Sequence, residues 1–195
     1  EIYTLSLHDA LPISSLLVFS LDELVVYPAQ GVGKIERIET QEIGGVPTEL
    51  IIVRILSNNV TLMVPVKTAQ NVGLRGIYTA EQGREILLYL QDRSDFTGYS
   101  GQNWNRRYRE YSEKLKSSNL RDVAYVLKEL ILIGKDKELS FGERRLLEQA
   151  MGLISLELSF ALGQEQAEVK KSIEARFADI LRKESADDAA EAEEE

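Results

Sequence analysis

The chain's single tryptophan is followed closely by arginines in the segment GQNWNRRYREYSEKLK, residues 101–116. Trp104 precedes Arg106, Arg107 and Arg109. Guanidinium groups neutralise phosphates, and a flat apolar ring can cover or wedge against an unstacked base pair. These residue types at this spacing could therefore recognise the fork of a partly opened nucleic acid.

Helical periodicity supports a second interpretation of the tryptophan. Trp104, Tyr108, Tyr111 and Leu115 follow the spacing i, i+4, i+7, i+11, which is typical of a buried stripe. Asn103 is a good N-cap residue and would put Trp104 in the first helical turn. A buried stripe often runs past the edge of its core at that point. The two alternatives, a core anchor and a presented ring, therefore stay open.

Residues for catalysis or metal binding are scarce. The chain has no cysteine, and its one histidine, His8, lies near the start of the chain. Thiol nucleophiles and cysteine-based metal sites are therefore excluded, and the commonest general base is missing from the rest of the chain. The GVGK of residues 31–34 lacks the spacing of a phosphate-binding loop. A binding module without metal or cofactor is favoured over an enzyme that uses paired carboxylates.

The formal net charge of −9 is unevenly distributed along the chain. Residues 184–195, ESADDAAEAEEE, hold seven acids and no base, and the rest of the chain has 25 acids against 23 bases. Residues 101–121 hold six bases and two acids. A local basic segment of this kind either forms a site for a polyanion or is the solvated face of a helix.

Length and composition indicate a globular protein of one or two domains. Of the 195 residues, 44% are hydrophobic and 28% are charged. No apolar run approaches the roughly 20 residues needed to cross a bilayer. The opening EIYTLSLHDALPIS resembles the translation of a sequencing adapter. We expect residues 1–18 to be a non-native or disordered leader and residues 184–195 to be a disordered acidic tail.

Short strands joined by turns dominate residues 19–77 and predict a small antiparallel barrel or strongly bent sheet. KIERIETQEI alternates imperfectly, as a twisted or bulged strand would. In VTLMVPV, one face carries Leu62 and Val64, and the other carries Met63 and Pro65. Proline cannot donate to a sheet ladder, so Pro65 marks an edge strand or a strand end, which either binds another chain or is blunted.

Helical patterns fill residues 78–183, so the predicted fold class is α+β with about five helices after the β domain. Thr79 is a predicted N-cap, and Ser140 with Glu143 has capping-box spacing. Gly134 and Gly163 are expected to end helices.

Several stretches resemble the CarD/CdnL family of bacterial transcription regulators. They are DELVVYPAQGVGKIERIE, VPVKTAQNVGLRG, NWNRRYREYSEKLKSSNLRDVAYVLKEL and LSFGERRLLEQAMGLISLELS, and they cover about residues 19–182 in unbroken order. The resemblance implies a Tudor-like β domain over 19–77 that docks on the RNA polymerase β subunit. It also implies a compact helical domain over 78–183 that contacts promoter DNA at the upstream edge of the melted region.

The resemblance also implies which residues contact DNA. In the family, a tryptophan lodges in the minor groove beside the open fork, and Trp104 occupies that position. Basic residues just after it contact the DNA backbone, and Arg106, Arg107 and Arg109 stand at those positions.

Gln41, Met63 and Pro65 correspond to polymerase-docking positions of the family. Some members have arginines where this chain has Gln41 and Met63, so docking here would rest more on apolar and backbone contacts. The acidic end of the chain resembles the short form of the family, which lacks a basic DNA-binding tail.

The resulting hypothesis is a non-enzymatic, monomeric and cytoplasmic regulator that stabilises the open promoter complex at ribosomal RNA and other housekeeping promoters. Its partners would be the polymerase β subunit and promoter DNA, with no membrane and no cofactor. The main alternative is a protein-interaction adaptor in which Trp104 lies in the core and the arginines are solvated. An enzyme that uses a carboxylate pair would need a concave pocket, and the sequence shows no pattern that predicts one.

Overall fold

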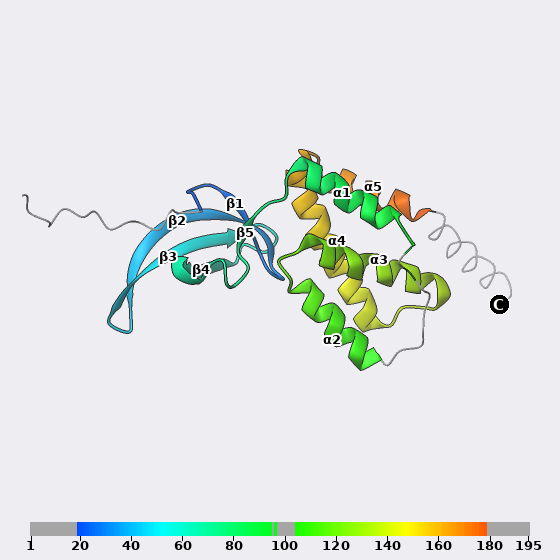
Figure 1. Cartoon of the computed structure of the whole chain (residues 1–195), viewed down its shortest axis with the longest axis horizontal. Coiled ribbons are helices and arrows are strands. Elements are labelled where there is room, and N and C mark those ends of the chain that lie inside the picture. The colour runs from blue at the N-terminus through cyan, green and yellow to red at the C-terminus, as the bar shows by residue number, and fades with distance from the viewer. Residues whose placement is uncertain (1–18, 95, 97–103, 179–195) are drawn as a thin grey trace, which may run out of the picture.

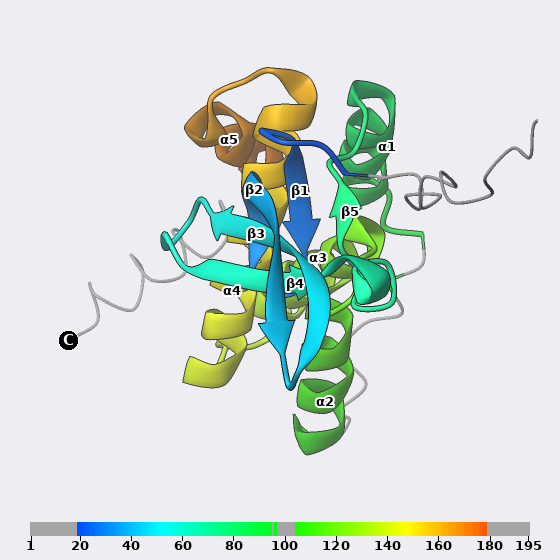
Figure 2. The same ribbon diagram turned by 90° about the vertical axis from the view of Figure 1, so that its left-hand side faces the viewer.

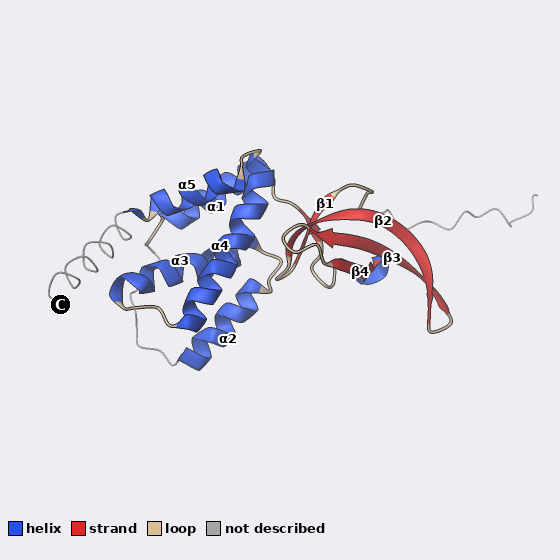
Figure 3. Ribbon diagram, turned by 180° about the vertical axis from the view of Figure 1, so that it is seen from behind, coloured by secondary structure: helices blue, strands red, loops and turns tan. Residues whose placement is uncertain are grey.

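The computed structural model describes residues 19–94, 96 and 104–178. The expected leader and acidic tail, and the expected N-cap Asn103, lie outside these residues. An antiparallel sheet comes first along the chain and five helices follow it (Figures 1 and 3). The predicted α+β class and its order are therefore confirmed.

The sheet has five strands in the order β4-β3-β2-β1-β5, and all neighbouring strands are antiparallel. The pairing of β2 with β3 is irregular between Ile35 and Arg37, as expected for a bulged strand. The strand β4 lies at one edge and ends at Pro65, as the proline predicted. In chain order the elements are β1 (Leu24–Tyr27), β2 (Gly31–Ile43), β3 (Val46–Ile55), β4 (Thr61–Pro65), the 3₁₀ turn η1 (Val66–Thr68) and β5 (Arg75–Gly76).

One face of the sheet builds a small core of its own. Alternate residues of β3 and β4 point into it, because side chains along a strand alternate between the two faces. Leu62 and Val64 belong to this side, as predicted. The buried residues of the cluster are Phe19, Val25, Ile35, Ile51, Val53, Ile55, Val64, Ala69 and Leu74.

The helices begin and end largely where side-chain chemistry predicts. Thr79 and Ser140 each cap a helix through a reciprocal capping box, and Gly163 ends a helix at a φ of 63°. The expected helix end at Gly134 is wrong, because the helix continues to Asp136 and buries the residues just before the glycine. The helices are α1 (Ala80–Gln91), α2 (Trp104–Leu115), α3 (Leu120–Asp136), α4 (Phe141–Leu162) and α5 (Gln166–Arg176).

A second core unites the five helices. Leu127, Leu130, Ile154, Leu158 and Phe177 are all fully buried in it. Viewed from the side of the sheet, the helices lie behind the strands (Figure 2). No single helix of the described residues is long and apolar enough to span a membrane, and only α4 and α5, bent by 115° at their junction, pass such a test as a pair.

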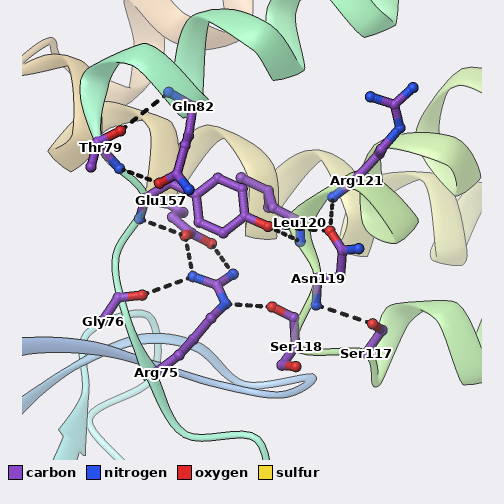
Figure 4. A network of polar contacts seen from close by, with 11 residues as sticks. Arg75, Gly76, Thr79, Gln82, Ser117, Ser118, Asn119, Leu120, Arg121 and Glu157 are labelled. Atoms are coloured by element: carbon purple, nitrogen blue, oxygen red, sulfur yellow. Dashed lines mark hydrogen bonds and ion pairs between the residues drawn. The ribbon is translucent and has the colours of Figure 1, made fainter. Parts of the chain in front are cut away.

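A buried carboxylate joins the two cores. Glu157 of α4 is 2% exposed and accepts hydrogen bonds from both Nη atoms of Arg75, at 2.5 and 3.0 Å (Figure 4). It also accepts from the backbone N–H of Tyr78 at 3.1 Å. The Nε of Arg75 donates to the carbonyl of Ser118, and its guanidinium lies 4.5 Å from the ring centroid of Tyr78. The last strand of the sheet is thereby bound to two separate parts of the helical domain.

Two glycines allow the backbones to approach closely at the same junction. Gly31 and Gly73 both have a φ of +85°, which other residues adopt at a cost. A Cβ at Gly31 would lie 3.1 Å from the side chain of Leu153, and one at Gly73 would lie 2.8 Å from Pro28 and 3.2 Å from Ser118.

We expect Glu157→Ala to lower the free energy of unfolding by about 3 kcal/mol, because it leaves the largely buried guanidinium of Arg75 without its counter-charge. Urea unfolding measures the change. Glu138→Ala is the matched control, since Glu138 pairs with Arg144 at 3.1 Å on the surface. Equal losses in the two variants would contradict a structural role for the junction.

Candidate nucleic-acid and protein interfaces

The indole of Trp104 lies at the start of α2, partly buried against the helical core. It rests on the first turn of α4, where a Cβ added at Gly142 would lie only 3.0 Å from the indole Cζ2. Its other neighbour is Tyr108, whose ring centroid lies 5.4 Å away at an interplanar angle of 57°. The indole is therefore supported on one side and accessible on another.

The periodic stripe of α2 is only partly buried. Tyr111 and Leu115 are each 2% exposed, as the periodicity predicted, whereas the predicted burial of Tyr108 is wrong because that side chain is 46% exposed. The stripe leaves the core toward the N-terminus of the helix. Trp104 thus combines the two alternatives, because one part of its ring packs inside and another part remains exposed.

Arg107 is buried, whereas its place in the basic segment predicted an exposed side chain that contacts the DNA backbone. Its side chain is 8% exposed, and its Nη2 donates to Oε1 of Glu143 at 2.9 Å. Its guanidinium also lies 5.9 Å from the ring centroid of Trp104. The burial arises because Arg107 shares the inward face of α2 with Tyr111, one turn further along. We therefore assign Arg107 a positioning role beneath the indole.

Glu143 organises this buried charge cluster from the first turn of α4. Lys137 donates to its two carboxylate oxygens at 2.8 and 2.9 Å, and the backbone N–H of Ser140 donates at 2.8 Å. Burial opposes ionisation of the carboxyl, but the hydrogen bonds from Lys137 and Ser140 outweigh it and hold the pKa of Glu143 below its ordinary value. The cluster ties α2, the end of α3 and α4 together next to Trp104.

Arg106 and Arg109 are exposed on the outer face of α2. At about 100° per residue, Arg106 points roughly 160° around the helix axis from Trp104. The two arginines line a shallow surface depression with Asn105, Glu110 and Glu113. The structure brings them together with each other, and not with the indole.

The predicted partner residues share one face of the sheet. Met63 and Pro65 of β4 pair with Ile52 and Leu50 of β3, and Gln41 of β2 pairs with Thr48 of β3. Directly paired residues point to the same side of a sheet. This outer face lies opposite the sheet's core, and Leu50 and Ile52 form a buried apolar floor beneath it. Met63 is 61% exposed at the edge.

Two features escaped prediction. Phe141 is 79% exposed at the first residue of α4, next to Gly142. Leu146, Ala150 and Ile154 are buried at helical spacing in α4, and the position of Phe141 off this spacing is the signal that could have revealed it. Glu143 was expected only as a capping residue, and its second role depends on Arg107 and Lys137, which lie 36 and 6 residues away in the sequence.

Comparisons with known proteins agree with this organisation. The family model described as "CarD-like/TRCF RID domain" matches residues 19–77, and the model "CarD, C-terminal domain" matches residues 85–174. The chain is also similar to "Putative transcription factor YdeB" of Bacillus subtilis (strain 168). The two are 25% identical over 155 residues, which cover 78% of this chain and 98% of the relative.

We expect Gly142→Val to push the indole outward, because any Cβ at this position meets the ring. Trp104 is the only tryptophan, so intrinsic fluorescence reports it directly. The emission should shift to longer wavelength and become easier to quench with acrylamide. Gly152→Val is the control, since a Cβ there meets nothing within 4 Å. An unchanged emission in Gly142→Val would mean that α4 does not support the indole.

Glu143→Gln should lower the free energy of unfolding by about 3 kcal/mol at neutral pH, because two cations lose a buried counter-charge. The folded-state pKa of Glu143 lies below the ordinary value of 4.5, so the ion pairs stabilise the protein above that pH. This contribution is lost as the pH falls through the folded-state pKa. The difference between wild type and variant should therefore shrink below about pH 4.5, and a pH-independent difference would contradict the assignment.

Proposed function

The chain belongs to the CarD/CdnL family of transcription regulators, and on this premise we propose that it stabilises the open promoter complex of RNA polymerase. In this proposal the sheet docks on the polymerase β subunit. The start of α2 contacts promoter DNA at the upstream edge of the bubble. The single observation that carries the proposal is the partly exposed indole of Trp104, held at the edge of the helical core by a buried charge cluster.

The polymerase would bind the outer face and the β4 edge of the sheet. The family model for residues 19–77 supports an interaction with RNA polymerase in general. An exposed edge strand can add a strand of the partner through backbone hydrogen bonds, and exposed side chains then select that partner. Met63 at 61% exposure supplies apolar area, and Gln41, whose amide donates to Glu39 at 2.6 Å, supplies a polar contact beside it.

The DNA contact would combine one ring with a few charges. The exposed part of Trp104 covers the last base pair at the fork from the minor groove, with Tyr108 beside it. Arg106 and Arg109 neutralise phosphates further along the backbone. Because so few phosphates are contacted, free DNA should bind weakly and with a strong dependence on salt. Polymerase therefore supplies most of the positional information.

A modest preference for the open state is sufficient for regulation. If the protein binds the open complex 1.4 kcal/mol more tightly than the closed one, the equilibrium moves about tenfold. The differential contact would be the indole, since a closed duplex offers no unstacked pair for it to cover. The protein would act in the cytoplasm as a monomer and without a cofactor, at ribosomal RNA and other housekeeping promoters.

One arrangement favours the adaptor alternative, in which the helical domain binds no DNA. Arg106 and Arg109 share their surface depression with two acids, Glu110 and Glu113, as on an ordinary solvated helix face. The partial burial of Trp104 is also compatible with a core residue at the rim. Effects on open-complex lifetime separate the two functions, because an adaptor has no reason to alter it.

We expect two substitutions to separate stabilisation of the open complex from binding of polymerase. Trp104→Ala should shorten the lifetime of the open complex about tenfold, since the proposed contact with the fork is lost. It should leave polymerase binding nearly intact, because the β4 edge of the sheet is unchanged. Met63→Asp should weaken polymerase binding, because it puts a charge on the exposed edge of the sheet. Polymerase pull-down and competitor-challenged lifetime assays measure the two effects.

Leu88→Asp is the matched control for Met63→Asp, since Leu88 is 65% exposed on α1, outside both proposed surfaces. Thermal unfolding of every variant checks that the fold is retained. Parallel loss of both activities in Trp104→Ala, at unchanged stability, would refute the division between the two surfaces. An unchanged lifetime would leave the adaptor as the better function.

A further inference from the structure

Phe141 has the most exposed side chain among the large hydrophobic residues of the described chain, at 79%. It stands directly after the capping residue Ser140, at the first residue of α4. The buried side of this helix carries Leu146, Ala150 and Ile154, and Phe141 has no part in it. Its ring therefore contributes little to the stability of the helical core.

Single apolar residues are often exposed, so exposure alone does not indicate that Phe141 has a function. The location of Phe141 provides the argument. The next residue, Gly142, is the one on which the indole of Trp104 rests. Tyr108, 46% exposed, lies against the same indole. The helices α2 and α4 begin at the same end of the helical domain (Figures 1 and 3), so Phe141 stands one residue before the glycine that supports the indole.

The charges around Phe141 favour an anionic partner. The acid in the first turn of α4, Glu143, is buried and paired with Arg107 and Lys137, so it presents no negative charge outward. Arg144 and Arg145 follow it and are both exposed, although Arg144 pairs with the solvated Glu138 at 3.1 Å. The start of a helix also carries a partial positive charge. An exposed ring beside cationic groups matches an unpaired nucleotide, which offers a base to stack on and a phosphate to neutralise.

We propose that Phe141 is a second nucleic-acid-contacting ring, which stacks on an unpaired base at the fork next to the base pair covered by Trp104. This inference rests on the proposed function and adds the single strand to its partner. Trp104 would close the double-stranded side of the junction, and Phe141 would retain the first base released from it. Stacking of this kind accepts any base, because every base has a flat face.

Open-complex lifetimes with polymerase holoenzyme and the full chain test the proposal. Phe141→Ala should shorten the lifetime about fivefold, since one stacking contact is lost. Phe141→Tyr should keep the wild-type lifetime, and Phe141→Leu should behave like the alanine variant because it is apolar but cannot stack. Leu88→Ala is the matched control for removal of an exposed apolar side chain. Unaltered thermal unfolding is expected for all four, because Phe141 and Leu88 are both exposed.

Fork-junction DNA locates the contact. Abasic nucleotides are placed one at a time in the first unpaired positions. At one of these positions the abasic nucleotide should abolish the difference in complex lifetime between wild type and Phe141→Ala. It should preserve the difference at the other positions. Persistence of the difference at every abasic position would overturn the base contact.

The outcomes distinguish this inference from the function on which it rests. A lifetime that Trp104→Ala shortens and Phe141→Ala does not would overturn only the second ring. A lifetime that neither variant changes would overturn the proposed function as well. Loss of polymerase binding in Phe141→Ala would assign the ring to a protein surface and would also refute the proposal.

Discussion

The arrangement of the whole molecule depends on a carboxylate that the helical domain buries and that an arginine of the sheet neutralises. Glu157 lies at 2% exposure among helices, and its guanidinium partner, Arg75, comes from the last strand of the sheet. An unpaired charge at this depth would cost several kcal/mol, so undocking of the sheet from the helices is disfavoured. The ion pair therefore favours one placement of the two proposed binding surfaces relative to each other, although each domain has its own core.

The helix α4 connects this junction to the proposed DNA contact. Glu143 lies in its first turn and Glu157 lies 14 positions later, which corresponds to about 21 Å along the axis. Both are buried acids whose partners come from other elements: Arg107 from α2 for Glu143, and Arg75 from β5 for Glu157. The helix α4 thus links the position of Trp104 to that of the sheet. Movement of either ion pair would displace the indole from a fork that polymerase has positioned.

The local parts of the structure were predictable from the sequence, and the long-range parts were not. The caps at Thr79 and Ser140 depend on residues within three positions, so Thr79 could be predicted from its residue type and Ser140 from its spacing to Glu143. Gly134 misled the helix prediction because burial of its neighbours outweighs the weak intrinsic preference of a glycine to end a helix. The pair Arg75–Glu157 joins residues 82 positions apart, and no periodicity within one element announces such a contact.

The lack of a sequence signal for long-range contacts also explains why the burial of Arg107 was not predicted. Position in a basic segment could not separate Arg107, which is buried, from Arg106 and Arg109, which are exposed. The i+4 relation of Arg107 to the buried Tyr111 was the available signal. Because arginines are rarely buried, the basic segment instead predicted that Arg107 is exposed to DNA. A pairing acid on another helix was required, and only the fold identified Glu143 in that role.

The partial burial of the indole has a consequence for how it can work. A fully projecting tryptophan would lose rotamer freedom on contact with DNA, and this loss would weaken binding. Trp104 is already restricted by Gly142 below it and Tyr108 beside it, so less conformational entropy remains to be lost. The support also limits how deeply the ring can enter a base step. A supported ring is therefore better suited to cover the end of a duplex that polymerase has opened than to open the duplex itself.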